Sequence, residues 1–381
     1  MRSTPDRGLT LRTERPRAPS GESDSESELL SASASASAAG GELIAPHPQT
    51  PPPAPMYIPK SAQAARTNLL SEKNPIAALA GIALDEKSHT YTYRGAAAPV
   101  SATGLVAPHF PQFDAAAVVA KNFERWRERP ESPYCAVIRA HDTKDAATAA
   151  ILEGWKRKGD EACRLGTRTH KAVEDLLNGA TRAQCDTRDI EPEIDAWTRW
   201  RDEWATARGL RPFRTELLLC ALDERGAICV GGAIDALFRD DAGQYWLLDW
   251  KRAKPFGPKV GLRWAGRGTG PAAALPDTPF SRYALQLAIY ARMLREQTGI
   301  DVGERRLLVR LAPAGEQPGY ENVDAHCPEC DRAAKRLLRA AGAAQSERQL
   351  RAAGAAQSER ARKRQKKTIK SKSAQIATAK V

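Results

Sequence analysis

The sequence contains no run of about 18 apolar residues, the length that a membrane-spanning helix needs. No secretory signal is visible at the N-terminus. We therefore expect an intracellular protein that makes no membrane contact. The seven cysteines are an odd number and follow no regular spacing. This usage suits a reducing compartment better than a scaffold built on disulfides.

Acidic residues are scarce at one end of the chain. Residues 331–381 hold 15 Lys/Arg and 3 Asp/Glu, which accounts for the whole formal net charge of +12, so the rest of the chain balances to zero. The basic run within 360–372 is typical of a polyanion-binding tail or a nuclear address, and equally of a solvated end. A mitochondrial or other organelle address is the alternative, from five arginines in the first 17 residues, but Asp6 and Glu14 do not fit it.

Low-complexity segments lie on both sides of one candidate domain, residues 78–340. Residues 1–77 are rich in Ser, Ala and Pro and lack the apolar periodicity that offsets the entropy of ordering, so we expect disorder. The segment LRAAGAAQSER occurs at 338–348 and again at 350–360. This repeat is too short and too rich in Gly and Ala for a solenoid. We interpret residues 341–381 as frayed helix or linker leading into a disordered basic tail.

The pattern within the candidate domain predicts helices first, then a cluster of strands, then a helix and a strand. Alternation predicts a short strand at 88–95. The predicted helices cover 113–128, 145–178, 191–208 and 281–297, and the further predicted strands cover 214–222, 228–239, 244–251 and 305–312. This order indicates an α/β domain with a central mixed sheet flanked by helices.

The stretch GGAIDALFRDDAGQYWLLDWKRAK places charges inside two apolar strands that the turn DDAGQ joins. If Arg239 pairs with Tyr245, Asp235 falls opposite Asp249 on the same face, about 5 Å apart at Cβ. Two carboxylates at that spacing repel unless a cation joins them, as a hard divalent ion such as Mg²⁺ does. Lys251 is then placed to orient or help deprotonate a bound water. The alternative is that these are ordinary charges at strand ends.

This stretch resembles the core of the PD-(D/E)xK nuclease superfamily, in which an Asp ends one strand and (D/E)-x-K ends the next. Three further segments are similar to the branch of RecB-like and mitochondrial genome maintenance exonuclease-like nucleases. They are GTRTHKAVEDLLNG with His170, RTELLL with Glu216, and QLAIY with Gln286 and Tyr290. The motifs stand in the family's order across about residues 85–325. The resemblance implies a restriction-endonuclease-like core and a nuclease that acts on DNA.

The resemblance also implies roles for individual residues. His170, Asp235 and Asp249, with the backbone carbonyl of Trp250, would hold Mg²⁺ or Mn²⁺, and an imidazole ligand favours Mn²⁺. Asp235, Asp249 and Lys251 are the expected catalytic residues. Lys251 would position the attacking water and stabilise charge on the phosphate.

Four side chains are expected to support this site. Glu174 lies one helical turn from His170 and either holds the imidazole ring or is a surface acid. Glu216 occupies the acidic position that the resemblance assigns to the strand before Asp235. Gln286 and Tyr290 would organise the site and the DNA path, with core packing as the alternative for Tyr290.

Three other features call for an interpretation. Gly231 and Gly232 permit the close approach of backbone or substrate. The helical stripe of Trp197, Trp200 and Trp204 is more typical of core than of a base-stacking platform. The pair Cys327 and Cys330 has no third cysteine after it, which argues against an iron–sulfur cluster and leaves a zinc site without ligands.

The leading hypothesis is therefore a divalent-metal-dependent deoxyribonuclease, an exonuclease that prefers single-stranded DNA or DNA ends, with the basic tail adding affinity. One alternative is a structure-specific or duplex endonuclease of the same fold. The other is a non-catalytic nucleic-acid-binding protein, which the presence of both aspartates and Lys251 does not favour.

Overall fold

The structure is a computed structural model that describes the backbone of residues 69–378 and the side chains of residues 69–360, 362 and 363. Most of the N-terminal region expected to be disordered lies outside these residues. The packed part of the chain extends ahead of the expected boundary at residue 78, since Leu70 is buried and its backbone N–H donates to Oδ1 of Asn178 at 3.0 Å.

Helices make up much of the fold. The α-helices of the described residues are α2 (Leu69–Lys73), α3 (Ala102–Val106), α4 (Ala115–Glu128), α5 (Cys135–Arg139), α6 (Lys144–Leu177), α7 (Glu191–Arg199), α8 (Pro279–Thr298) and α9 (Pro328–Thr378). Local chemistry sets several of their ends. Thr143 caps α6 by accepting from Ala146, and Thr278 caps α8 by accepting from Ser281. Gly299 ends α8 in the left-handed conformation that glycine adopts without strain.

The strands form two sheets. They are β1 (Ile82–Asp85), β2 (Thr90–Tyr93), β3 (Ala96–Ala97), β4 (Arg211–Leu222), β5 (Ile228–Arg239), β6 (Tyr245–Arg252), β7 (Arg306–Leu311) and β8 (Tyr320–Asp324). The small antiparallel sheet has the order β1-β2-β3, and the central sheet has the order β4-β5-β6-β7-β8. Only β6 and β7 run parallel in the central sheet, with α8 between them in sequence. The predicted α/β class with a mixed sheet and flanking helices is confirmed.

The hairpin of β5 and β6 has the predicted register. Arg239 pairs with Tyr245, and the ladder continues to Ala236 and Leu248. Asp240 closes the turn, because its backbone N–H donates to the carbonyl of Gln244 at 3.0 Å and its Oδ1 accepts from the Gln244 N–H at 2.8 Å.

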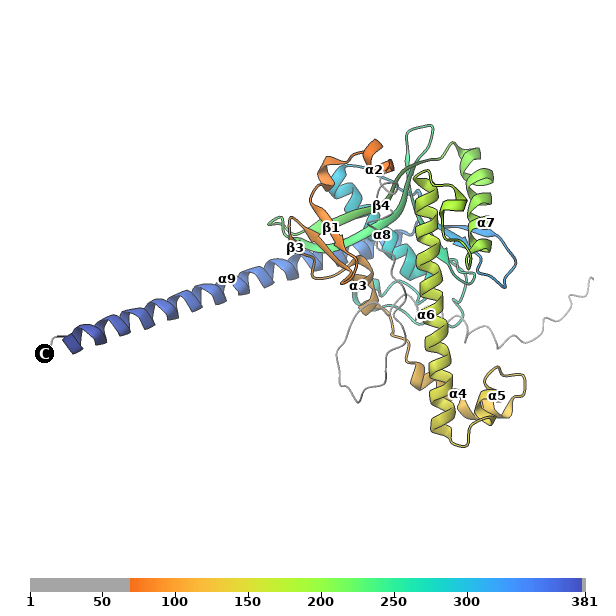
Figure 1. Ribbon diagram of the computed structural model, residues 1–381, viewed down its shortest axis with the longest axis horizontal. Helices are drawn as coiled ribbons and strands as arrows, with labels where there is room; N and C mark the ends of the chain where they lie inside the picture. The colour runs from red at the N-terminus through yellow and green to blue at the C-terminus, as the bar shows by residue number, and fades with distance from the viewer. Residues whose placement is uncertain (1–68, 379–381) are drawn as a thin grey trace, which may run out of the picture.

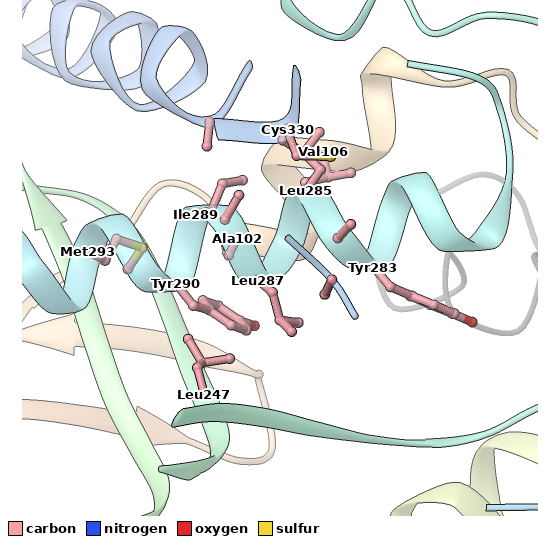
Figure 2. Close-up of a cluster of buried hydrophobic side chains, with 14 of the residues drawn as sticks. Ala102, Val106, Leu247, Tyr283, Leu285, Leu287, Ile289, Tyr290, Met293 and Cys330 are labelled. Atoms are coloured by element: carbon pink, nitrogen blue, oxygen red, sulfur yellow. The ribbon is translucent and has the colours of Figure 1, made fainter. Parts of the chain in front are cut away.

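Two hydrophobic cores lie on the two faces of the central sheet. On one face, α6 and α7 bury Val173 and Trp197 against Phe238 of β5. On the other face, α8 buries Leu287 against Leu247 of β6, as Figure 2 shows. The stripe of Trp197 and Trp200 is therefore core, as expected, while Trp204 is partly buried beside it.

A third, smaller core lies away from the sheet. It joins α4, α5 and the first half of α6 through Phe123, Trp126, Ile138, Ile151 and Trp155. The 34-residue helix α6 thus spans two cores, and in Figure 1 its lower end carries α4 and α5. His170 lies in the half of α6 that packs on the sheet.

Several elements were not predicted, among them β1 and β3 of the small sheet. The short polar strand β8, with sequence YENVD, pairs with β7 at an edge of the sheet and was not predicted. Helix α9 continues through residue 340, the expected end of the domain, and projects away from the body (Figure 1). Of the two interpretations of the segment after 340, the described backbone is helix rather than linker. No described helix combines the length and apolar character that crossing a membrane requires.

Candidate functional site

Asp235 and Asp249 lie at the ends of the paired part of β5 and β6. They are the positions next to the last ladder pair, Ala236 with Leu248, at which the pairing of the two strands ends. The backbone N–H of Trp250 donates to Oδ2 of Asp235 at 2.9 Å, which ties the first carboxylate to the second strand. Asp249 has the same parity as Leu247 and therefore lies on the α8 side of the sheet.

Asp249 is a buried charge with little compensation. Its side chain is 4% exposed, its Oδ2 lies 2.6 Å from Nζ of Lys251, and this oxygen accepts no hydrogen bond of good geometry from the described residues. Burial and the neighbouring Asp235 carboxylate raise the pKa of Asp249 to about 6, although Lys251 and His170 oppose the shift. The site thus carries more negative charge than Lys251 neutralises.

Lys251 follows on the same side of β6. Burial by itself lowers the pKa of Lys251, but the Asp249 and Asp235 carboxylates outweigh it and raise the pKa above its usual value. Nζ also lies 4.8 Å from the centroid of the Tyr283 ring of α8. Lys251 is therefore held as a cation between carboxylates and an aromatic face.

His170 reaches the strand pair from α6. Its Nε2 lies 2.8 Å from the carbonyl oxygen of Trp250, and its Nδ1 lies 3.3 Å from Oδ2 of Asp235. The Trp250 side chain is buried in the opposite core against Trp197 and Trp200, which leaves its backbone carbonyl at the site. The sequence-predicted set of His170, Asp235 and the Trp250 carbonyl is thus brought together.

Glu216 lies closer to the site than its supporting role suggests. Its neighbours Thr215 and Leu217 pair with Ala236 and Ile234, so Glu216 stands across from Asp235. Its φ is +43°, a left-handed conformation that is uncommon and costly for a residue with a side chain. One ligand atom each of His170, Glu216 and Asp235 lie within 4.8 Å of one another. A three-donor cluster therefore includes Glu216, while Asp249 pairs with Lys251 beside it.

The supporting residues of α8 touch each other. Nε2 of Gln286 donates to Oη of Tyr290 at 2.8 Å, and burial raises the pKa of Tyr290. Tyr290 is 5% exposed and packs beside Leu247 (Figure 2). Core packing, left open for Tyr290, is therefore observed. Glu174 lies 3.2 Å from Nζ of Lys171, and the His170 ring contacts Asp235 and the Trp250 carbonyl.

The glycine pair of β5 admits close neighbours, and one of them is backbone, as expected: the Gly231 N–H donates to the carbonyl of Val100 at 3.0 Å. A Cβ on Gly232 would lie 2.5 Å from Cε1 of Tyr290, and a Cβ on Gly231 would lie 2.2 Å from Cβ of Tyr91. The glycines therefore also admit these two tyrosine side chains. Burial, Glu216 and Asp235 raise the pKa of Tyr91 to about 12, so this tyrosine of β2 borders the site. Sequence reasoning missed Tyr91, because only the packing of the small sheet brings it there.

A basic loop connects the site to α8. Between Arg252 and Asp277 it contains Lys254, Lys259, Arg263 and Arg267 and no acidic residue. Its base is fixed beside Lys251, because buried Phe256 packs edge-on against Tyr283 with ring centroids 5.3 Å apart. Its outer part exposes Trp264 at 73%, with the Arg263 guanidinium 4.9 Å from the Trp264 ring centroid.

Comparisons with known proteins give no family. Neither a protein-family model nor a curated protein matches the chain. One solved structure, titled "Crystal structure of SSO0001", aligns over 48% of this chain and 69% of its own with 16% identity and a TM-score of 0.23. A likeness this weak carries no argument about fold or function.

Proposed function

We propose that this protein is a divalent-metal-dependent nuclease that hydrolyses phosphodiester bonds in DNA. The observation that carries the proposal is the convergence of Asp235, Asp249 and Lys251 from one hairpin with His170 from α6 and Glu216 from β4. An excess of carboxylates beside a fixed lysine cation suits metal-assisted phosphate hydrolysis.

The donor set fits Mg²⁺ or Mn²⁺. Carboxylate and carbonyl oxygens are what these ions prefer, and one imidazole shifts the preference toward Mn²⁺. His170, Glu216 and Asp235 would hold the ion, with the Trp250 carbonyl and Asp249 as further ligands. The buried Oδ2 of Asp249, which lacks a hydrogen bond from the described residues, supports this assignment. The ion would lower the pKa of a bound water and offset charge on the phosphate.

Lys251 has a defined task in this proposal. Because Asp249 and Asp235 raise its pKa, Lys251 remains protonated and is poorly suited to be a general base. Of the two roles considered from sequence, orienting the water or helping to deprotonate it, the first is favoured. Its ammonium group would also donate to a phosphate oxygen, where negative charge grows as the bond breaks.

The basic loop supports a single-stranded substrate. Exposed Trp264 beside Arg263 offers the combination of aromatic face and positive charge on which unpaired bases stack. The base of the loop contacts Tyr283, which Lys251 also contacts. A strand lying on the loop would therefore be led toward Lys251. We accordingly propose an exonuclease that acts on single strands or on DNA ends.

The test uses linear single- and double-stranded DNA, labelled at either the 5′ or the 3′ end, with Mg²⁺, Mn²⁺ or chelator. We expect stepwise shortening of single strands that needs a metal and is lost in Asp249→Asn and Lys251→Ala. Asp241→Asn, an exposed carboxylate at the turn of the same hairpin, is the matched control and should keep activity. Metal-dependent cleavage of circular DNA would indicate an endonuclease instead. Binding without cleavage under every metal would indicate a non-catalytic protein.

A further inference from the structure

Cys327 and Cys330 meet at the N-terminus of α9, far from the hairpin in sequence. The backbone N–H of Asp331 donates to the Cys327 carbonyl at 3.0 Å, so Cys327 is the residue that precedes the first turn. The backbone N–H of Cys330 donates to Sγ of Cys327 at 3.2 Å. Cys327 thus takes the place that Ser or Asp commonly takes at a helix start, with sulfur as the acceptor.

The two thiols differ in access. Cys327 is half-buried, whereas Cys330 is fully buried in the core beside Leu285 and Val106 (Figure 2). The Cys330 thiol and its backbone N–H hold the pKa of Cys327 at about 7, against burial and nearby acidic groups that raise it. Hydrogen bonding to Cys327 and burial raise the pKa of Cys330. One sulfur is therefore accessible and activated, and the other is protected next to it.

A metal site does not account for the pair. Among the described residues, three or more metal-binding side chains come together only at His170, Glu216 and Asp235. Cys327 and Cys330 are not part of that group. The nearest acidic groups of α9 are engaged with arginines: Glu329, whose Oε2 lies 4.0 Å from Sγ of Cys327, pairs with Arg332 at 2.5 Å, and Asp331 makes a two-pronged ion pair with Arg306 at 2.5 and 2.9 Å.

We propose that Cys327 and Cys330 form a redox-active dithiol that is oxidised by small disulfides, with Cys327 as the attacking sulfur and Cys330 as the resolving one. The spacing of two residues between the cysteines, the helix start and the unequal access of the two sulfurs are the features that such a reaction needs. This inference stands independently of the proposed nuclease activity.

The reaction balances in two exchanges. The Cys327 thiolate attacks one sulfur of R–S–S–R, forms a mixed disulfide and releases R–S⁻, which takes a proton from water. Cys330 then loses its proton to water, attacks the Cys327 sulfur and releases the second R–S⁻, which is protonated in turn. Two protein thiols are oxidised to one disulfide, and one small disulfide is reduced to two thiols.

The other cysteines provide an internal control. Cys163 is exposed on α6, but burial of its sulfur and Asp160 raise its pKa above 9.0. At neutral pH Cys327 is therefore the more readily deprotonated of the two thiols, and we expect it to be alkylated faster than Cys163.

The experiment uses the full-length chain, reduced and freed of reductant, with neutral 2-hydroxyethyl disulfide as the probe. Thiols are counted by maleimide labelling after an acid quench, and adducts are located by peptide mass spectrometry. We expect the wild-type chain to lose two thiols and keep no adduct. Cys330→Ser should accumulate the mixed disulfide at Cys327. Cys327→Ser should neither lose two thiols nor accumulate an adduct. Cys163→Ser should behave as the wild type.

A second measurement uses the wild-type chain alone, so its result does not depend on whether the variants fold. The alkylation rate of Cys327 in the wild-type chain, followed against pH, should rise with a midpoint near 7 and exceed that of Cys163 at neutral pH. A wild-type chain that keeps a stable adduct at Cys327, or that alkylates Cys163 faster than Cys327, would overturn the proposal.

Discussion

The buried charge of Asp249 predicts that the site lowers stability when no metal is bound. Asp249→Asn keeps the shape of the side chain and removes its charge. The pKa of Asp249 rises from 3.8 to about 6 on folding, so the folded state binds this proton more tightly than the unfolded state. Such a group lowers the free energy of unfolding as pH rises from about 4 to about 6, and the cost stays constant above that range.

The shift sets the size of the effect. A change of roughly two pKa units corresponds to about 3 kcal/mol at about pH 7.5, and the cost falls below about 1 kcal/mol near pH 4. We therefore expect Asp249→Asn to be more stable than the wild type by up to about 3 kcal/mol in chelator at about pH 7.5. In a domain of this size the difference corresponds to a rise in Tm of roughly 6–12 °C.

The assay is thermal unfolding of both proteins in chelator at several pH values between about 4 and 8. Adding Mn²⁺ should raise the Tm of the wild type more than that of Asp249→Asn, because a bound cation offsets the charge that the variant lacks. The reasoning is refuted if Asp249→Asn is less stable than the wild type at about pH 7.5. That result would mean that the 2.6 Å contact with Lys251 outweighs burial and the repulsion from Asp235.

Three further predictions concern other parts of the chain. Trp264→Ala should weaken binding of single-stranded DNA in chelator by about 1–3 kcal/mol, as measured by fluorescence anisotropy. The Tm should change little because Trp264 is 73% exposed. Unchanged affinity would contradict a stacking role. Gly232→Ala should destabilise the fold by about 1–3 kcal/mol in urea unfolding, because its Cβ would lie 2.5 Å from the Tyr290 ring, and a neutral effect would show that the ring moves freely. Deleting residues 347–381 removes eleven Lys/Arg and two Glu but keeps the 2.9 Å hydrogen bond from Ser346 to Asp223. It should flatten the salt dependence of DNA binding, whose slope is about −0.7 for each phosphate contact on a single strand, and a preserved slope would assign the attraction to the domain itself.

Local pattern was enough to predict the hairpin and its register from Arg239 with Tyr245 to Ala236 with Leu248. Strand alternation and a five-residue turn place Arg239 opposite Tyr245, and the next positions along the ladder follow from that pairing. The helices around His170 and Gln286 also follow from local periodicity. In each case the determining interactions join residues that are close in sequence.

Only the tertiary structure decided which side chains belong to the site and which pack in the core. His170 contacts the Trp250 carbonyl although 80 residues separate them in sequence. Glu216 lies near His170 and Asp235, and its backbone has a left-handed conformation that strand alternation does not predict. Tyr91 comes from a separate sheet, and the space it fills is the reason for Gly231. The sequence by itself determined the strand register and the charges that the hairpin carries, because backbone geometry repeats every two residues. Contacts between distant elements depend on how whole faces pack, and no short stretch of sequence encodes that.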